Sequence, residues 1–309
     1  MNSIAIFLVT TYFILAVSHA SPIETKNKNV LDEKEVIYTG EHEIVKIYTS
    51  LALMEELEVQ RRLVFFIEAD INNDGKKLDK GLYVIIDNST TKLLNNGKDI
   101  AGDATGKVFF ATNDGVYAFN PKERTAYKYG HMEEKIISLA VENNTGVIYA
   151  LTENHIMYKI TENGNKSEVD DRVQHAREII IDMLDNLYYF DEHKNLYVVV
   201  DHDAKKIDGL PKNPTSITMI KPPIGVEGIF LIADDVPYIV YSNGTTIKSE
   251  DAKLHRTKST AYSFDAMIVL YFGHEKKIYE YNILEKIITG IFEGLSDWVK
   301  KNLSFVTFP

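Results

Sequence analysis

Apolar and aromatic residues return along this chain in a cassette with nearly constant spacing. The cassette joins two short apolar runs across a polar turn, and its clearest copy reads GKVFFATNDGVYAF. Its first aromatic residue recurs at intervals of 40, 39, 42 and 41 residues, at Phe109, Tyr149, Tyr188, Phe230 and Tyr271. This period is typical of one four-stranded blade of a β-propeller and not of a helical repeat.

A sixth, degenerate copy precedes these five and contributes Phe65, with a longer connection to its second aromatic residue, Tyr83. In the five regular copies the two aromatic residues lie 8 or 9 positions apart around a polar turn, which predicts a β-hairpin. An apolar run before each hairpin suits an inner strand, and a short polar run after it suits an outer strand. We therefore predict an all-β, six-bladed β-propeller with four antiparallel strands per blade, spanning residues 21–290.

A propeller ring closes when a strand from one end of the chain completes the blade built by the other end. Residues 36–39 suit the outer strand of the last blade, but residues 286–289 occupy the same slot by their spacing. We expect the amino-terminal strand to close the ring. In the tail, residues 291–309, the apolar residues of segment 296–303 have helical spacing. This predicts a short amphipathic helix on the propeller, with membrane contact as the alternative.

The first 20 residues form an apolar segment that is too short to span a membrane comfortably. It ends in Ser18-His19-Ala20, with small residues at the two positions that a signal peptidase reads. We predict a signal peptide over residues 1–20 and a secreted, extracellular protein. Because this segment contains no Lys or Arg, a retained membrane anchor is the alternative. Five Asn-x-Ser/Thr acceptors agree with secretion, at Asn88, Asn143, Asn165, Asn243 and Asn302.

The expected strand order places four of these acceptors on one face of the propeller. Asn143 falls in a turn between a first and a second strand, and the other three fall in turns between third and fourth strands, at Asn88, Asn165 and Asn243. Glycans would cover this face and leave the opposite face open to a ligand.

Composition narrows the classes of partner. The formal net charge is -11, with 45 acidic against 34 basic residues, which disfavours nucleic acid and anionic membranes as partners. The chain has no Cys, and a chain of this length buries enough surface to fold without disulfides.

The sequence lacks the motifs of the common hydrolases and of phosphate-binding loops, and its His residues have no zinc-ligand spacing. We therefore expect no catalytic residues, metal or cofactor. Carboxylates recur at the ends of the inner strands, at Asp103, Glu142, Asp182 and Asp265. Calcium binding, as in lactonase-type six-bladed propellers, is one interpretation of them. Their position just before a turn favours another, in which each carboxylate accepts hydrogen bonds from backbone N–H groups.

Two segments carry a resemblance to a known family. The stretch GKVFFATNDGVYAFN with the following RTAYKYG, and the opening EVIYTGEHEIVKIYTSLALMEELEVQRRLVFFIEADINNDG, resemble the insect ommochrome-binding proteins, over roughly residues 36–281. The resemblance implies a secreted haemolymph protein that binds and carries tryptophan-derived pigments without converting them. Such pigments are planar, aromatic and acidic, so a pocket for them should offer aromatic faces and local positive charge.

Basic residues stand just before several inner strands, at Lys98, Lys135, Arg177 and Lys258. We expect them to flank one end of the central channel and to favour an anionic planar ligand, with ordinary solvated surface charges as the alternative. Two other functions stay open. One is a calcium-dependent lactonase or esterase on the same fold, and the other is a protein-interaction propeller related to the royal-jelly and yellow-type proteins.

Overall fold

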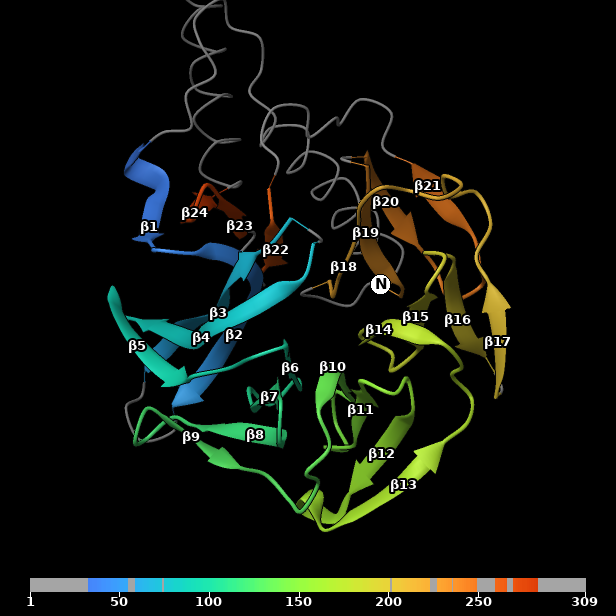
Figure 1. Cartoon of the computed structure of the whole chain (residues 1–309), viewed down its shortest axis with the longest axis horizontal. Coiled ribbons are helices and arrows are strands. Elements are labelled where there is room, and N and C mark those ends of the chain that lie inside the picture. The colour runs from blue at the N-terminus through green and yellow to red at the C-terminus, as the bar shows by residue number, and fades with distance from the viewer. Residues whose placement is uncertain are drawn as a thin grey trace, which may run out of the picture.

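The structure, a computed structural model, contains six four-stranded antiparallel sheets arranged as blades around a common axis (Figure 1). It describes residues 33–54, 59–73, 75–200, 202–222, 227–234, 236–248, 259–265 and 269–282. This architecture confirms the predicted six-bladed β-propeller. The expected signal peptide (residues 1–20), the alternative closing strand (286–289) and the tail (291–309) lie outside the described residues.

Each blade runs from an inner strand at the axis to an outer strand at the rim. The first three blades are β2 (Glu43–Met54), β3 (Val59–Ile71), β4 (Lys77–Ile86) and β5 (Ser89–Leu94); β6 (Asp99–Gly102), β7 (Val108–Thr112), β8 (Gly115–Asn120) and β9 (Thr125–Lys128); and β10 (Ile136–Val141), β11 (Ile148–Thr152), β12 (Met157–Thr161) and β13 (Lys166–Asp170). The last three are β14 (Ala176–Ile181), β15 (Leu187–Asp191), β16 (Leu196–Val200) and β17 (Asp203–Lys206); β18 (Ile217–Ile220), β19 (Ile229–Ala233), β20 (Val236–Val240) and β21 (Thr246–Lys248); and β22 (Ala261–Phe264), β23 (Val269–His274), β24 (Lys277–Asn282) and β1 (Val36–Thr39).

Two short 3-10 helices, η1 (Glu33–Glu35) and η2 (Glu162–Gly164), complete the described elements. Across the described ranges, no helix is long and apolar enough to cross a membrane.

The amino-terminal strand closes the ring. Strand β1 pairs antiparallel with β24, with Val36 opposite Tyr279 and Thr39 opposite Lys277. The sixth blade thus takes three strands from the carboxyl-terminal part of the chain and its outer strand from the amino-terminal part. This confirms the expectation that residues 36–39, VIYT, form the closing strand.

The six cassette aromatics occupy equivalent positions in the second strand of each blade. In each blade this residue pairs with the one that follows the cassette's second aromatic in the third strand, as Phe65 pairs with Val84 and Phe109 with Ala118. All six are buried and pack against the next blade around the ring. Because side chains alternate between the two faces of a strand, a fixed register gives every blade the same contact with its neighbour.

The hydrophobic core therefore consists of six layers, each between two consecutive blades. Rings meet across these layers, as where Phe65 lies edge-on to Phe119 at 5.0 Å between centroids and Phe230 lies edge-on to Phe264 at 6.3 Å. Such layers bury the large faces of the sheets and leave the inner strands around a central channel.

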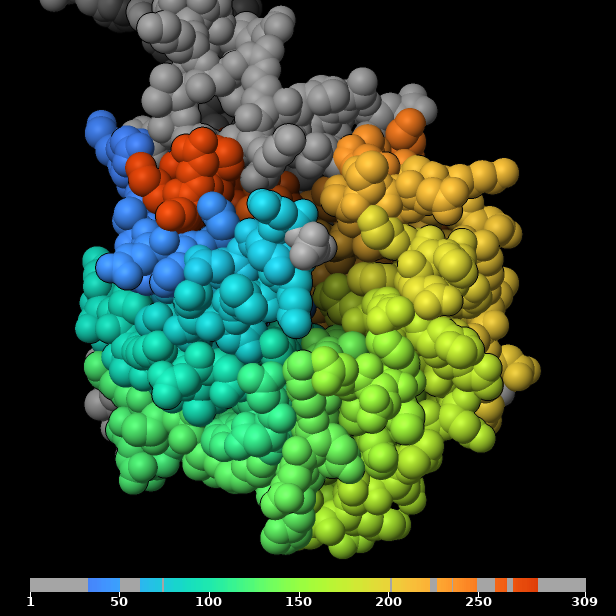
Figure 2. Space-filling model, viewed as in Figure 1, coloured from blue at the N-terminus to red at the C-terminus, as the bar shows by residue number. Residues whose placement is uncertain are grey.

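One hairpin departs from the regular blade. Strands β3 and β4 are longer than their equivalents, as the longer connection in the first cassette suggests. In Figure 1 this cyan hairpin extends from its blade toward the middle of the ring, and in Figure 2 its atoms extend over the middle of the face in view. Lys77, on this hairpin, is exposed, but nearby protein partly desolvates its ammonium group and lowers its pKa, while the carboxylates of Glu178 and Asp99 act in the opposite direction.

Candidate functional site

The central channel encloses a cavity of about 360 Å³ lined by all six inner strands. Most of its wall is apolar, and it includes residues such as Ile47, Ile100, Leu139, Ile180 and Met219. Aromatic rings from the first and the last blade add to the wall, from Tyr48, Tyr262 and Phe264. The size and the lining are those of a pocket for a small, largely apolar molecule.

Polar side chains replace this apolar lining at one level of the channel. Lys46, Asp99, Ser138 and Glu178 come from β2, β6, β10 and β14, and each pairs with the residue two positions after the cassette aromatic. The equal register brings them to the same height along the axis, near the end where the inner strands begin.

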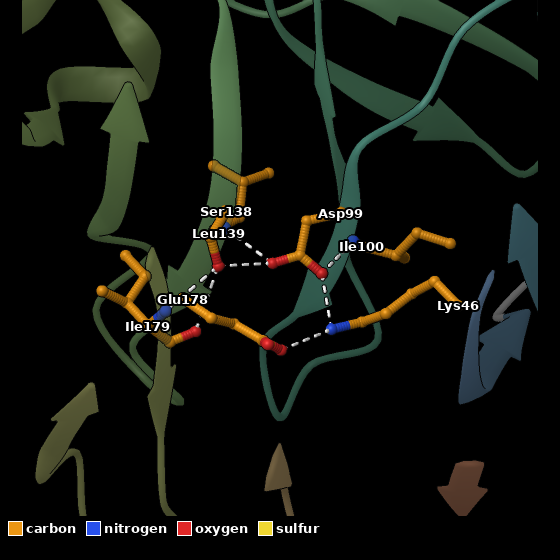
Figure 3. Close-up of polar contacts among 7 residues, drawn as sticks. All are labelled: Lys46, Asp99, Ile100, Ser138, Leu139, Glu178 and Ile179. Carbon is orange, nitrogen blue, oxygen red and sulfur yellow. Dashed lines mark hydrogen bonds and ion pairs between the residues drawn. The ribbon is translucent and has the colours of Figure 1, made fainter. Parts of the chain in front are cut away.

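These residues form a connected cluster (Figure 3). The Lys46 Nζ lies 2.6 Å from Asp99 Oδ1 and 3.4 Å from Glu178 Oε1. The Ser138 hydroxyl donates to Asp99 Oδ2 at 2.7 Å, and the backbone N–H of Leu139 donates to the same oxygen at 3.0 Å. Since Lys46 belongs to the first blade and Glu178 to the fourth, their contact spans the ring between opposite blades (Figure 1). We call Lys46, Asp99, Ser138 and Glu178 the channel bridge.

The charges of the channel bridge depend on each other. Burial alone would lower the pKa of Lys46, but the carboxylates of Asp99 and Glu178 outweigh this effect and raise it above its ordinary value. Burial raises the pKa of Glu178 above the usual range, and the nearby Asp99 adds to this, while Lys46 acts in the opposite direction. The ammonium group thus occupies the place between two carboxylates that a cation would occupy.

The other end of the cavity lies at the turns between first and second strands. Lys221 follows the inner strand of the fifth blade, and its Nζ approaches Gly102 O of the opposite, second blade at 3.4 Å. Burial lowers the pKa of Lys221, and Asp185, Asp103 and Asp182 counteract this. Among the described residues, no carboxylate lies within ion-pair distance of this ammonium. Lys221 is therefore a half-buried cation at the edge of an apolar cavity.

Three of the four recurring carboxylates cap these turns with hydrogen bonds from backbone N–H groups, as their position in the sequence predicted. Asp103 Oδ1 accepts the backbone N–H groups of Thr105 and Lys107 at 2.9 and 3.0 Å. Asp182 Oδ1 accepts two turn N–H groups in the same way, and Asp265 Oδ1 accepts that of Val269. Glu142 differs, because its carboxylate accepts the hydroxyls of Thr145 and Tyr149. Within the described residues, no three His, Asp or Glu side chains converge in a way that would hold a metal ion.

The predicted basic residues lie on the face opposite these turns, and each described one is paired with an acidic residue. Lys98 lies 2.6 Å from Asp79, Lys135 pairs with Glu153, and Arg177 lies 3.3 Å from Glu192. Lys258 lies outside the described residues. The channel bridge separates these three side chains from the main cavity, so their role in ligand binding stays a prediction.

The described glycosylation acceptors share the face predicted for them, but they differ in exposure. Asn88, Asn165 and Asn243 are exposed in turns between third and fourth strands. Asn143 is only 2 % exposed, and its Nδ2 donates to Asp182 O at 2.9 Å and to Asp185 Oδ1 at 2.6 Å. A glycan on this buried nitrogen would disturb these contacts, so Asn143 is a poor acceptor. Asn302 lies outside the described residues.

Comparison with known proteins places the chain by fold alone. No protein-family model matches it, and no curated protein is significantly similar. Among solved structures, it is similar to a streptogramin B lyase, with a TM-score of 0.54, 11% identity, and coverage of 80% of this chain and 95% of the other. It is also similar to YCF48 bound to D1 peptide, with a TM-score of 0.50, 9% identity, and coverage of 82% and 96%. Such low identities support the propeller fold and no particular activity.

Sequence reasoning missed both groups of polar residues in the channel. Lys46 and Glu178 stand next to apolar residues of their strands, in the runs EIVKIYTS and AREIII. Charged residues at the same register position of three inner strands, Lys46, Asp99 and Glu178, were the available signal. Lys221 directly follows the run ITMI and lacked any such pattern.

Proposed function

We propose that this chain is a secreted, non-catalytic binding protein that carries an ommochrome-type, tryptophan-derived pigment in its central channel. The observation that carries the proposal is the cavity between the channel bridge and the turns, with its mostly apolar wall. A planar aromatic molecule would bury its faces against this wall and against the rings of Tyr48 and Phe264. The resemblance of the cassettes to the ommochrome-binding proteins supports the same ligand class.

A positive charge inside the channel also favours an acidic ligand, although the protein as a whole is acidic. Lys221 supplies a half-buried ammonium to which no described carboxylate is paired, so a ligand carboxylate would gain a charge-assisted hydrogen bond there. The predicted requirement for local positive charge is thus met by a residue inside the cavity.

The channel bridge favours binding over calcium-dependent hydrolysis. A calcium site in a channel needs several oxygen ligands around an open position. Here the Lys46 ammonium already stands between the carboxylates of Asp99 and Glu178 and offsets part of their negative charge. We therefore propose a carrier and not a lactonase-like enzyme.

A pigment titration tests the proposal. When an ommatin is titrated into the purified protein until binding saturates, the visible absorption band of the pigment should shift and the stoichiometry should be defined. The variant Ile180→Trp places a larger side chain at the channel wall and should abolish binding, while Val169→Trp, at a position that is 61% exposed on an outer strand, should not. Circular dichroism checks that both variants fold. Absence of pigment binding by the unmodified protein would overturn the proposal, and unchanged binding by Ile180→Trp would place the ligand outside the channel.

A further inference from the structure

We propose that the turn-side end of the channel is a subsite for the α-amino-acid head group of an aromatic ligand. This inference rests on the proposed function, because it requires a small molecule in the channel. It adds the chemistry by which one end of that molecule is recognised. Three side chains carry it: Lys221, Asn143 and Asp103, all of which line the cavity.

Lys221 provides the cationic half of the subsite. Its only hydrogen bond to a described residue is a long one, 3.4 Å from Nζ to the carbonyl oxygen of Gly102 across the channel. An ammonium group has three donors, so at least two remain for a ligand. A carboxylate is the group that gains most from such a partly dehydrated ammonium, because charge-assisted hydrogen bonds strengthen where water is excluded.

Asn143 provides a fixed acceptor that lacks a donor. Both hydrogens of its Nδ2 are engaged, by Asp182 O and Asp185 Oδ1, and these contacts fix the orientation of the amide. Its Oδ1 is buried and has no hydrogen-bond partner among the described residues. A buried carbonyl oxygen without a donor is costly, and native proteins rarely leave one unless a ligand or water supplies the donor.

Asp103 adds negative charge beside this acceptor. Its Oδ1 accepts the hydrogen bonds that cap the turn, whereas its Oδ2 has no donor from the described residues. The backbone N–H of the next residue, Ala104, donates to Asn143 O at 3.1 Å, so the turns that carry Asp103 and Asn143 are in direct contact, and Lys221 lines the same cavity. The free carboxylate oxygen is suited to an ammonium group, and the buried Asn143 oxygen adds a second acceptor once the ligand displaces the atoms that cover it.

Together these groups complement a zwitterion. Lys221 suits a carboxylate, and Asn143 Oδ1 with Asp103 Oδ2 suits the adjacent α-ammonium. The apolar wall between them and the channel bridge suits an aromatic side chain. A simple fatty acid would leave the two acceptors unmatched, and an amine without a carboxylate would meet the repulsion of Lys221.

Isothermal titration calorimetry with L-kynurenine and two analogues tests the subsite. One analogue lacks the carboxylate and the other lacks the α-amino group. Both should bind at least about tenfold more weakly than L-kynurenine, the effect of losing one charge-assisted hydrogen bond. In Lys221→Met, L-kynurenine and the analogue without a carboxylate should bind with the same affinity. Asp103→Asn keeps an acceptor for the turn. In this variant the difference in affinity between L-kynurenine and the analogue without an amino group should become smaller.

The outcomes separate this inference from the proposed function. Equal affinities of the three compounds for the unmodified protein, or unchanged L-kynurenine binding in Lys221→Met, would overturn the subsite even if an ommatin binds. Failure of the ommatin to bind while L-kynurenine binds with the expected pattern would overturn the pigment carrier and keep the subsite. No binding of any of these compounds would overturn both. Lys221→Arg, which retains the positive charge, is the matched control and should preserve most of the affinity.

Discussion

Replacing Lys46 of the channel bridge by Met is expected to destabilise the protein strongly, because it leaves two carboxylates in the channel without their cation. The substitution keeps an unbranched side chain of similar length and removes only the ammonium. It leaves Asp99, whose side chain is 4% exposed, and Glu178 without the cation between them. Breaking a fully buried ion pair costs about 3–5 kcal/mol, and since the Lys46 and Glu178 side chains are each 26% exposed, we expect about 2–4 kcal/mol here.

The effect should depend on pH in a defined direction. Burial and Asp99 already raise the pKa of Glu178, and the loss of Lys46 raises it further. Between the pKa of an unfolded Glu, about 4.3, and this raised value, the folded state holds a proton that the unfolded state has released. The free energy of unfolding of Lys46→Met should therefore fall as pH rises through this window, and the variant should lie closer to the unmodified protein in acid than at neutral pH.

Chemical denaturation followed by circular dichroism measures both effects. Lys166→Met is the matched control, because Lys166 and Glu168 form a pair 3.7 Å apart with both side chains more than half exposed. Such a pair is worth about 0–1 kcal/mol. Adding Glu178→Gln to Lys46→Met should recover part of the loss by removing the isolated charge. A loss at neutral pH no larger than that of the control, or no dependence on pH, would refute the reasoning.

Two further predictions concern the surface. Replacing Lys98 and Arg177 together by Gln should weaken the binding of an anionic pigment and reduce its salt dependence. The effect should be smaller than that of Lys221→Met, because both side chains already have acidic partners. An equal or larger effect in the same pigment titration would place the ligand at their end of the channel. Glycopeptide analysis of protein secreted from insect cells should find glycans at Asn88, Asn165 and Asn243 and none at Asn143, and a glycan on Asn143 would contradict its burial. The amino terminus of the secreted protein should be Ser21, and retention of residues 1–20 would contradict the signal peptide.

The sequence was sufficient for the architecture because a propeller repeats one local pattern. The distance from Phe109 to Tyr149 gives the blade period, and the distance between the two aromatics of each cassette gives the register of its hairpin. The alternation of side chains then determines which face meets the next blade. The turn-capping role of Asp103 and Asp182 was predictable for the same reason, since it depends only on residues two to four positions away.

The site could not be predicted in this way. Lys46 and Glu178 are 132 positions apart, and their contact requires the ring to place the first and fourth blades opposite each other. Lys221 reaches a carbonyl 119 positions away by the same geometry. The repeat can place charged residues at the same height, but only the closed ring determines which of them meet. The basic residues selected from the sequence were local features, and the three that the structure describes are paired with acidic residues on their own face of the propeller.

The pairing of β1 with β24 has a consequence for synthesis of the protein. Val36 is among the first residues of the propeller to emerge from the ribosome, and its partner Tyr279 is among the last. Until then β1 has no partner, and every blade already folded belongs to an open arc with exposed strand edges. Contacts of such high sequence separation form slowly, so an unfinished or truncated chain should aggregate or require chaperones. Deleting residues 36–39 should reproduce this behaviour in a chain of otherwise complete length.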